Sequence, residues 1–457
     1  GATHAVGGHM RGADDAELHD WLTDNAAGLV GKELVTLSTT PVYENGGLVP
    51  RPMTLRVFLA RTQAGWQVMP GGFARIGASA DPAAISMRNG GSVADVWIVG
   101  DAPVEAVTML KPQSAPFVRA KPGPLPSRAA DNLFWLGRYS ERFDNSARLL
   151  RVALTRVVEG GGEKTPALHS AMELAMHLHL LPNPEEEEKE KREPGIFAEH
   201  CLLEAIYDPN QPGSLAGSIR NLMWSATHVR ERLSLDHWHS LNRLQRDQQA
   251  ALKKHPSLTE AIAFLDRVLG VSSSLTGFAM DNMTRDDGWR FLIVGRRLER
   301  LSFLAQSIAH FLRMPSTRGP GSMEWLLELT DSIITNRSRY SRLPELLPVL
   351  DLLVFDDDNP HGISFQANVL ARYLERMARE LGEAHGSALS SAITRLRAFD
   401  LERFEAMQFT QCRSCSPCEE LATLLDQLDA AAGELSNWMG MRYFTHVGDV
   451  SRQTMAL

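Results

Sequence analysis

The apolar residues of this chain change their spacing once, and a proline-rich stretch marks the change. Between about residues 34 and 99, short apolar runs alternate with polar residues, as at Leu55, Val57 and Leu59, which is the period of a β-strand. After residue 127 the apolar residues recur about every 3.6 positions, the spacing of one face of an α-helix. The sequence therefore predicts an α+β fold that is mainly α, with a small β-rich part followed by a large helical bundle.

The proline-rich stretch sets the predicted domain boundaries. Residues 111–127 contain five prolines, which remove backbone donors and favour an extended chain, so we predict a linker there. Residues 11–110 then form the β-rich domain, and residues 128–457 form the helical domain. Residues 1–10 lack an initial Met and end in Gly-Gly-His-Met, which is typical of the remnant of an expression tag.

Composition argues against several classes of function. The chain of 457 residues is 44% hydrophobic and 22% charged, as in folded proteins, and its net charge of −8 argues against nucleic acid as a partner. No uninterrupted run of 18 apolar residues occurs, so we expect neither a transmembrane helix nor a membrane partner. Four cysteines are too few for a disulfide framework in a chain this long, which predicts a cytoplasmic protein.

One motif occurs twice in the helical part. Leu136–Arg142 (LGRYSER) is followed 158 residues later by Val294–Arg300 (VGRRLER). A second pair, Gln211–Leu215 (QPGSL) and Asn359–Ile363 (NPHGI), lies 148 residues apart in the same order. Two matching pairs at nearly equal offsets predict a duplicated helical unit, whose equivalent helices would pack opposite each other. The predicted repeats are residues 128–270 and 285–450.

Charged residues of the repeated motif could form an anion site. They share one helix face in each copy: Arg138, Glu141 and Arg142 in the first, and Arg296, Glu299 and Arg300 in the second. Guanidinium groups bind carboxylates and phosphates through paired hydrogen bonds, so convergence of the four arginines would create an anion-binding pocket. The alternative is that Glu141 and Glu299 only satisfy arginines of their own helix. His361, in the second motif, could also reach this cluster.

The helical part resembles the bacterial Alpha-E domain. The resemblance rests on Asp131–Arg142 (DNLFWLGRYSER) and Met283–Arg300 (MTRDDGWRFLIVGRRLER), and it covers about residues 127–450. Asp331-Ser332 with Arg339-Tyr340, Asp351–Phe355 with Asn359-Pro360, and Arg442–Phe444 extend it. The resemblance implies a helical fold, and it carries no settled activity with it.

The β-rich part is similar to the final portion of a circularly permuted ATP-grasp domain. The segments that carry the similarity are Leu37–Tyr43 (LSTTPVY), Arg51–Phe58 (RPMTLRVF), Met69–Gly72 (MPGG) and Asp95–Trp97 (DVW). In such fusions a longer ATP-grasp region precedes the Alpha-E domain, so we expect the missing ATP-grasp portion or a separate ligase subunit as a partner. Many relatives carry Gly-Ser-Lys-Asp ahead of the tryptophan, whereas Ala94 stands at the lysine's place here.

The two resemblances imply the C-terminal portion of an ATP-dependent carboxylate–amine ligase. Such an enzyme forms an acyl phosphate, uses ATP and Mg²⁺ as cofactors, and takes a small carboxylate or peptide as substrate. By position Arg56 would contact phosphate or acyl phosphate, and a glycine-rich turn near the nucleotide would comprise Arg88, Asn89, Gly90 and Gly91. Without the lysine and the rest of the ATP-grasp domain, we expect this chain alone not to turn over ATP.

Three closely spaced cysteines offer a rival site. Cys412, Cys415 and Cys418 have the spacing with which thiolates wrap zinc or an iron–sulfur cluster. Both need a fourth ligand, and the remaining cysteine, Cys201, lies more than 200 residues away. The alternative is a cysteine-containing turn between two helices that binds no metal.

Our hypothesis for the helical domain is an arginine-lined pocket for a carboxylate substrate or an acyl phosphate. Arg138, Arg142, Arg296 and Arg300 would bind the anion. Glu141 and Glu299 would orient the arginines or accept a proton from the incoming amine. Two rivals remain: a non-catalytic interaction scaffold, which predicts that Arg296 and Arg300 are fully paired within the protein and line no cavity, and a metal- or cluster-binding module.

Overall fold

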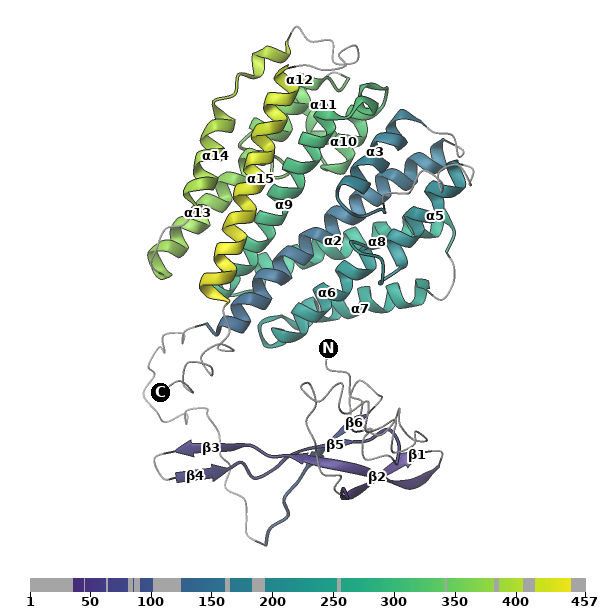
Figure 1. Ribbon diagram of the computed structural model, residues 1–457, viewed down its shortest axis with the longest axis vertical. Coiled ribbons are helices and arrows are strands. Elements are labelled where there is room, and N and C mark those ends of the chain that lie inside the picture. The colour runs from purple at the N-terminus through teal and green to yellow at the C-terminus, as the bar shows by residue number, and fades with distance from the viewer. Residues whose placement is uncertain are drawn as a thin grey trace, which may run out of the picture. The chain divides into compact units, whose positions relative to one another are not determined.

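The chain divides into two compact units, residues Gly1–Ala120 and Lys121–Leu457, and the division falls inside the predicted linker. The computed structural model describes all residues except 1–35, 45, 63–64, 81–84, 86–90, 102–124, 161–164, 183–193, 253–255, 342, 382–385, 406–415 and 445–457. The protein is mainly helical with a small antiparallel β region, which confirms the predicted fold class (Figure 1). The two units are described separately.

The first unit contains two antiparallel sheets. The strands are β1 (Thr39–Glu44), β2 (Gly47–Arg56), β3 (Leu59–Thr62), β4 (Gly65–Val68), β5 (Gly72–Ile76) and β6 (Ser92–Val96). Four of them form a sheet in the order β1-β2-β5-β6, and β3 pairs with β4. A tight turn joins β1 to β2, and Gly46 supplies the positive φ of 85° that this turn requires.

A proline lies inside an edge strand, and one predicted alternation does not hold. Pro41 lies in β1, opposite Pro50. Because β1 is at the edge of the sheet, a residue without an N–H is tolerated there. Leu55, Val57 and Leu59 do not share one strand, since β2 ends at Arg56 and β3 begins at Leu59. All three side chains are exposed, so their alternation does not mark a buried face.

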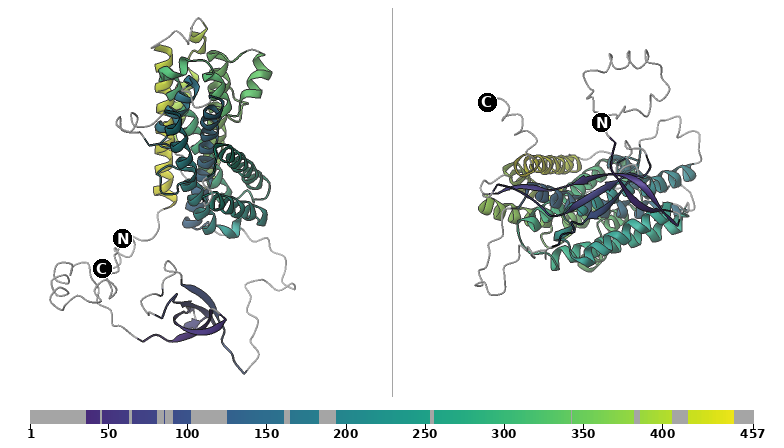
Figure 2. Two further views of the ribbon diagram at one scale, coloured as in Figure 1. Left: turned by 90° about the vertical axis from the view of Figure 1, so that its right-hand side faces the viewer. Right: turned by 90° about the horizontal axis from the view of Figure 1, so that it is seen from below.

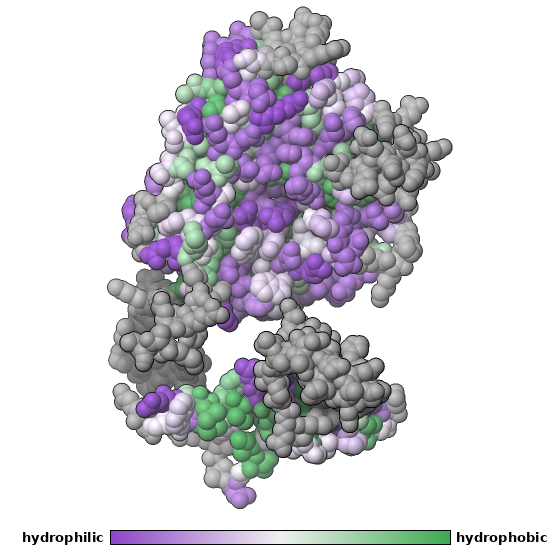
Figure 3. Space-filling model, viewed as in Figure 1, coloured by the Kyte–Doolittle hydropathy of each residue, from purple (hydrophilic) through white to green (hydrophobic). Residues whose placement is uncertain are grey.

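Among the described residues of the first unit, more large apolar side chains are exposed than buried. Among its described residues, Ala74 and Ile76 are the buried hydrophobic ones. Large apolar side chains lie in the open on both sheets and on the segment after β6, and we call them the exposed β surface: Tyr43, Leu48, Leu55, Val57, Phe58, Leu59, Trp66, Val68, Met69, Val93, Trp97, Ile98 and Val99. Figure 3 shows the hydrophobic colour concentrated on this unit. A monomeric domain rarely exposes so large an apolar area.

The second unit is a bundle of helices. Its α-helices are α2 (Ser127–Glu159), α3 (Pro166–His177), α5 (Pro194–Tyr207), α6 (Leu215–His228), α7 (Leu235–Leu252), α8 (Leu258–Asp281), α9 (Asp287–Arg313), α10 (Ser322–Leu329), α11 (Ile333–Tyr340), α12 (Leu346–Leu350), α13 (Ile363–Leu381), α14 (Ser387–Arg397) and α15 (Ser416–Tyr443). Short 3₁₀ turns and one π-helical turn, Asp351–Phe355, complete it.

Helices α2 and α9 lie side by side at the centre of this bundle (Figures 1 and 2). Helices α6 and α8 cover α2, while α13 and α15 cover α9. The core between them is closely filled, and Phe134, Phe143, Phe264 and Phe311 are among its fully buried side chains. Each such side chain contributes roughly 1.5–3 kcal/mol through removal from water.

Left-handed backbone follows both α3 and α10, while the duplication stays a prediction. His179 follows α3 with a φ of 57°, and Asp331 follows α10 with a φ of 51°. Left-handed backbone is uncommon for residues other than glycine. The two copies of the second motif then lead into α6 and α13, which pack on α2 and α9 respectively.

Helix α8 is long and apolar, although it contains no uninterrupted run of 18 apolar residues. Among the described helices it is the one long and apolar enough, by length and composition, to cross a membrane, and 39% of its most apolar 18 residues are buried inside the protein. An uninterrupted-run criterion misses it because Asp266 and Arg267 lie within it. Its buried face packs against α2 and includes Phe264, Leu265 and Val268, so bundle packing accounts for its composition.

Candidate functional site

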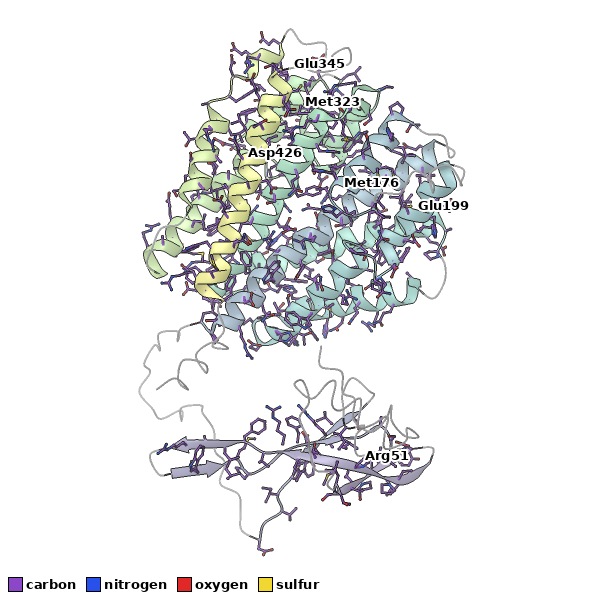
Figure 4. All side chains as sticks on the ribbon, in the orientation of Figure 1. Arg51, Met176, Glu199, Met323, Glu345 and Asp426 are labelled. Carbon is purple, nitrogen blue, oxygen red and sulfur yellow. The ribbon has the colours of Figure 1, made fainter. Side chains whose placement is uncertain are left out.

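The two copies of the repeated motif meet where α2 and α9 cross. Gly137 and Gly295 let the two backbones touch, because a Cβ atom at Gly137 would lie 2.1 Å from the carbonyl oxygen of Leu292. A Cβ atom at Gly295 would lie 2.2 Å from the carbonyl oxygen of Phe134. This close approach brings the charged residues of the two motifs within reach of one another. Side chains fill the space between the helices throughout the bundle (Figure 4).

Six of these side chains form what we call the Arg–Glu cluster: Arg138, Glu141, Arg142, Arg296, Glu299 and Arg300. On one side, Glu299 of the second repeat accepts a hydrogen bond from Arg138 Nε at 2.6 Å and another from Arg142 Nε at 2.6 Å. Arg142 Nη2 adds a third bond at 3.1 Å. Arg138 also donates to Ser436 Oγ on α15 at 2.6 Å.

The other side of the Arg–Glu cluster repeats this arrangement with the roles exchanged. Glu141 of the first repeat accepts from Arg296 Nε at 2.8 Å and from Arg300 Nε at 2.7 Å. Arg296 Nη2 donates to Thr276 Oγ1 on α8 at 2.8 Å. Each glutamate therefore binds two arginines of the opposite repeat, and the alternative of pairing within one helix is wrong.

The electrostatics keep both glutamates ionised. Burial by itself would raise the pKa of Glu141, but Arg300 and Arg296 outweigh it and hold this pKa at about 2. Burial likewise opposes the effect of Arg142 and Arg138 on Glu299, and the pKa of Glu299 is lowered. A general base works best with a pKa near the operating pH, so neither glutamate is well suited to take a proton from an amine at neutral pH.

The space beside the Arg–Glu cluster is small. The hollow lined by Arg296, Thr276 and His237 has a volume of about 10 Å³, which is room for a single water molecule at most. The side chain of Arg142 is 41% exposed, whereas those of Arg138 and Arg300 are 16% exposed. An anion would have to displace a glutamate to bind here, and anion binding by these arginines stays a prediction.

Two histidines lie near the arginines that bind Glu141. His237 is buried, and its Nδ1 meets no hydrogen-bond partner among the described residues. Burial and then Arg296 lower the pKa of His237 to about 4. Burial, followed by Arg300 and Arg148, lowers the pKa of His361 to about 4, so His361 does lie near the arginines, as the sequence suggested. Both imidazoles are uncharged at neutral pH.

Several partners in this region were not anticipated. Arg148 binds Asp144 at 2.9 Å and also lies 3.3 Å from Asp331 of the second repeat. Arg297 donates to Gln366 Oε1 at 2.9 Å, and burial together with Arg300 and Arg296 lowers its pKa to about 10. Spacing along one helix could not identify Asp331 or Gln366, because each lies more than 60 residues from the arginine that it binds.

The predicted phosphate-contacting residue lies on the exposed end of β2. Arg56 is exposed, and its guanidinium lies 5.7 Å and 5.9 Å from the ring centres of Phe58 and Phe73. Gly91 directly precedes β6, and Ala94 lies within that strand, opposite Ala74. The other predicted turn residues, Arg88, Asn89 and Gly90, lie outside the described residues.

The cysteine motif is only partly described. Cys418 is buried on α15, and Cys201 is buried on α5, while Cys412 and Cys415 lie outside the described residues. Over the described parts of the chain, no group of three or more His, Cys, Asp or Glu side chains is arranged to hold a metal ion. Metal binding by the cysteine motif stays a prediction.

Comparison with known families gives two matches. Residues 125–444 match the Alpha-E model, described as a predicted alpha-helical domain with a conserved ER motif. The repeated motif contains two Glu-Arg dipeptides, Glu141-Arg142 and Glu299-Arg300. They pair across the repeats, because the arginine of each dipeptide donates to the glutamate of the other. Residues 1–77 match circularly permuted ATP-grasp type 2. That match includes residues 1–10, which argues against their assignment to an expression tag.

The curated proteins that match are longer than this chain and are uncharacterised. Uncharacterised proteins of Mycobacterium tuberculosis and Mycobacterium bovis are 28% identical to this chain over 433 residues, or 89% of its length. The aligned part is 47% of each relative, so the chain spans about half the length of the curated relatives it matches. No solved structure matches the chain.

Proposed function

Because this chain belongs to the Alpha-E family and carries an ATP-grasp segment before that domain, we propose that it is part of an ATP-dependent ligase joining a carboxylate to an amine. ATP-grasp enzymes, by family resemblance, activate a carboxylate as its acyl phosphate. The observation that carries the proposal is the ATP-grasp match of residues 1–77. The matched segment includes β2, which ends in an exposed arginine, Arg56. Fixed cationic charge stabilises phosphoryl oxygens as they acquire negative charge.

The described β residues fit only part of an ATP site. Arg56 supplies positive charge, but Ala94 replaces the lysine of many relatives and supplies none. We therefore assign to this chain the binding of a phosphoryl group by Arg56, and to the partner the remaining nucleotide and Mg²⁺ ligands. The exposed β surface is the surface we expect this partner, the rest of an ATP-grasp domain, to cover.

A scaffold role for the helical domain is the second candidate. It is favoured because Glu141 pairs with both Arg296 and Arg300. The hollow beside them has a volume of only about 10 Å³. In this role the cluster holds the two repeats together, and the chemistry belongs to the ATP-grasp part. In the substrate-binding role, Arg142 is the best placed of the four arginines because it reaches solvent.

The ligase proposal is tested by measuring ADP release and amide formation. The complete protein encoded by the gene would be incubated with ATP, Mg²⁺ and mixtures of amino acids or short peptides, and the products identified by mass spectrometry. Arg56→Ala should lower ADP release at least about tenfold, since it removes charge-assisted bonds to a phosphoryl group. Arg61→Ala, an exposed arginine on β3, is the matched control. Equal rates for both variants, or no amide product from any pair, would contradict the proposal.

The two roles of the helical domain differ in what Arg142→Gln does to that activity. If Arg142 binds the carboxylate substrate, the KM for that substrate rises while the KM for ATP is unchanged. If the helical domain is a scaffold, both constants stay as in the wild type and only the free energy of unfolding falls.

A further inference from the structure

A groove lined by arginines lies outside the Arg–Glu cluster, where the start of α9 meets α13. It begins with a hollow of about 280 Å³ lined by Met280, Arg285, Trp289, Arg290, Tyr373 and Arg376. A second hollow of about 350 Å³ continues along α13 and shares Tyr373 and Arg376 with the first. Arg372 and Arg379 also line the second hollow. We propose that this arginine groove binds a diphosphate group, free or as part of a larger ligand.

The inner wall of the arginine groove is already ordered by the protein. Trp289 Nε1 donates to the carbonyl oxygen of Ala279 at 2.8 Å, which fixes the indole ring. The ring of Tyr373 meets Trp289 edge-on, with 5.5 Å between ring centres. The guanidinium of Arg285 lies 4.3 Å from the Trp289 ring centre and donates to the carbonyl of Met280. A cation held in this way loses little entropy when an anion binds.

The arginine groove carries a surplus of positive charge. Its two hollows are lined by five arginines and one acid, Glu375. Arg290, whose side chain is 8% exposed, forms an ion pair with Asp287, which adds a second acid. These five arginines concentrate positive charge along one surface of a chain whose net charge is −8. Such a local excess attracts anions of high charge.

The charge and the shape favour phosphate over carboxylate. A phosphate group carries about −1.5 to −2 charge at pH 7 and three acceptor oxygens, whereas one carboxylate carries a single charge. Arginine forks bind these oxygens in pairs. Two phosphates joined together match two adjoining hollows that share Arg376.

The test is calorimetric titration of sodium diphosphate into the full chain, in buffer with chloride as the only small anion. The groove variant is Arg285→Gln/Arg376→Gln, and both positions are exposed, so folding should be retained. The control variant is Arg243→Gln/Arg246→Gln, two exposed arginines on α7. We expect the groove variant to weaken diphosphate binding at least about tenfold and the control to leave it unchanged.

A second variant and two further ligands keep the test decisive. Arg372→Gln/Arg379→Gln, also exposed on α13, should weaken binding as well, and it replaces the first variant if that one fails to fold. Inorganic phosphate should bind more weakly than diphosphate. Equal binding by groove and control variants, no binding by the wild type, or tighter binding of a triglutamate peptide would overturn the proposal. None of these outcomes depends on ligase activity.

Discussion

At the scale of single residues, the glutamates of the Arg–Glu cluster matter more than its arginines. Each glutamate is nearly enclosed, with 2% and 11% of the side chains of Glu141 and Glu299 exposed, and each one neutralises two guanidinium groups. Losing one carboxylate therefore leaves two cations without a counter-charge in a poorly solvated place. Breaking a buried pair by removing one partner costs about 3–5 kcal/mol.

We therefore expect Glu141→Gln to lower the free energy of unfolding by about 3–5 kcal/mol. The measurement is urea denaturation followed by far-UV circular dichroism at neutral pH. The control is Glu419→Gln, which breaks the ion pair of Glu419, 61% exposed, with Arg313 and should cost no more than about 1 kcal/mol. Similar losses for the two variants would show that the cluster does not hold the repeats together.

His237 makes stability depend on pH in a definite direction. Burial, and then Arg296, lowers its pKa from 6.5 to about 4 in the folded protein, so the unfolded chain takes up a proton first as pH falls. Its contribution to stability is therefore complete above pH 6.5 and is lost progressively between pH 6.5 and about 4. Below that pH, the folded protein is protonated at this residue too and the dependence ends.

The variant His237→Phe should reduce this dependence. Between pH 7 and pH 5, we expect its free energy of unfolding to fall by about 2 kcal/mol less than that of the wild type, because one proton-linked residue is gone. Urea denaturation at the two pH values gives the comparison. His239→Phe, an exposed histidine on the same helix, should keep the wild-type dependence. An unchanged dependence in His237→Phe would mean that His237 is protonated alike in both states.

At the scale of elements, the crossing of α2 and α9 depends on two glycines. Gly137→Ala or Gly295→Ala would place a Cβ atom about 2 Å from a backbone oxygen of the other helix, and the helices would have to separate. Separation would lengthen the hydrogen bonds of the Arg–Glu cluster. Since backbone cannot move aside as a flexible side chain can, we expect each change to cost at least 1–3 kcal/mol, roughly the cost of overpacking a core.

Two glycines of α8 provide the matched control for this prediction. Gly270 and Gly277 have no atom within 4 Å of an added Cβ, so Gly270→Ala and Gly277→Ala gain helix propensity without a clash. We expect these two changes to stabilise the protein by up to about 1 kcal/mol. Thermal and urea denaturation of all four variants gives the comparison, and loss of stability in all four would show that the crossing is not special.

The elements themselves could largely be predicted from the sequence, and their partners could not. The helical period after residue 127 and the twofold occurrence of the Glu-Arg motif suffice to predict a duplicated bundle. Spacing along one helix identifies neighbours on its face, so it suggested that Glu141 pairs with Arg138 or Arg142. Its partners Arg296 and Arg300 are more than 150 residues away, and only the packing of α2 against α9 brings them there.

The β unit resisted prediction for a related reason. Alternation of apolar residues usually marks one buried strand face, but Leu55, Val57 and Leu59 are all exposed. The alternation is consistent with a face that another part of the protein covers. The arginine groove was missed as well, because Arg285 and Arg376 are 91 positions apart and share no motif.

At the scale of the whole molecule, the two units differ in how completely they bury their apolar residues. The helical unit, residues 121–457, has a continuous core, whereas the described part of the β unit buries Ala74 and Ile76 and little else that is apolar. We expect residues 121–457 expressed alone to unfold in one cooperative thermal transition. Residues 1–120 alone should show no such transition and should bind a hydrophobic dye strongly. A sharp transition and weak dye binding by the β unit would contradict this.

The exchange of partners in the Arg–Glu cluster has a consequence for symmetry. Glu141 and Glu299 each reach into the opposite half, so the same contacts would form if two identical half-length chains met about a twofold axis. Such an interface is isologous, because each chain gives the other the same residues that it receives. Within the single chain, the loss of either carboxylate leaves two arginines of the other half without their counter-charge, so the two halves depend on each other.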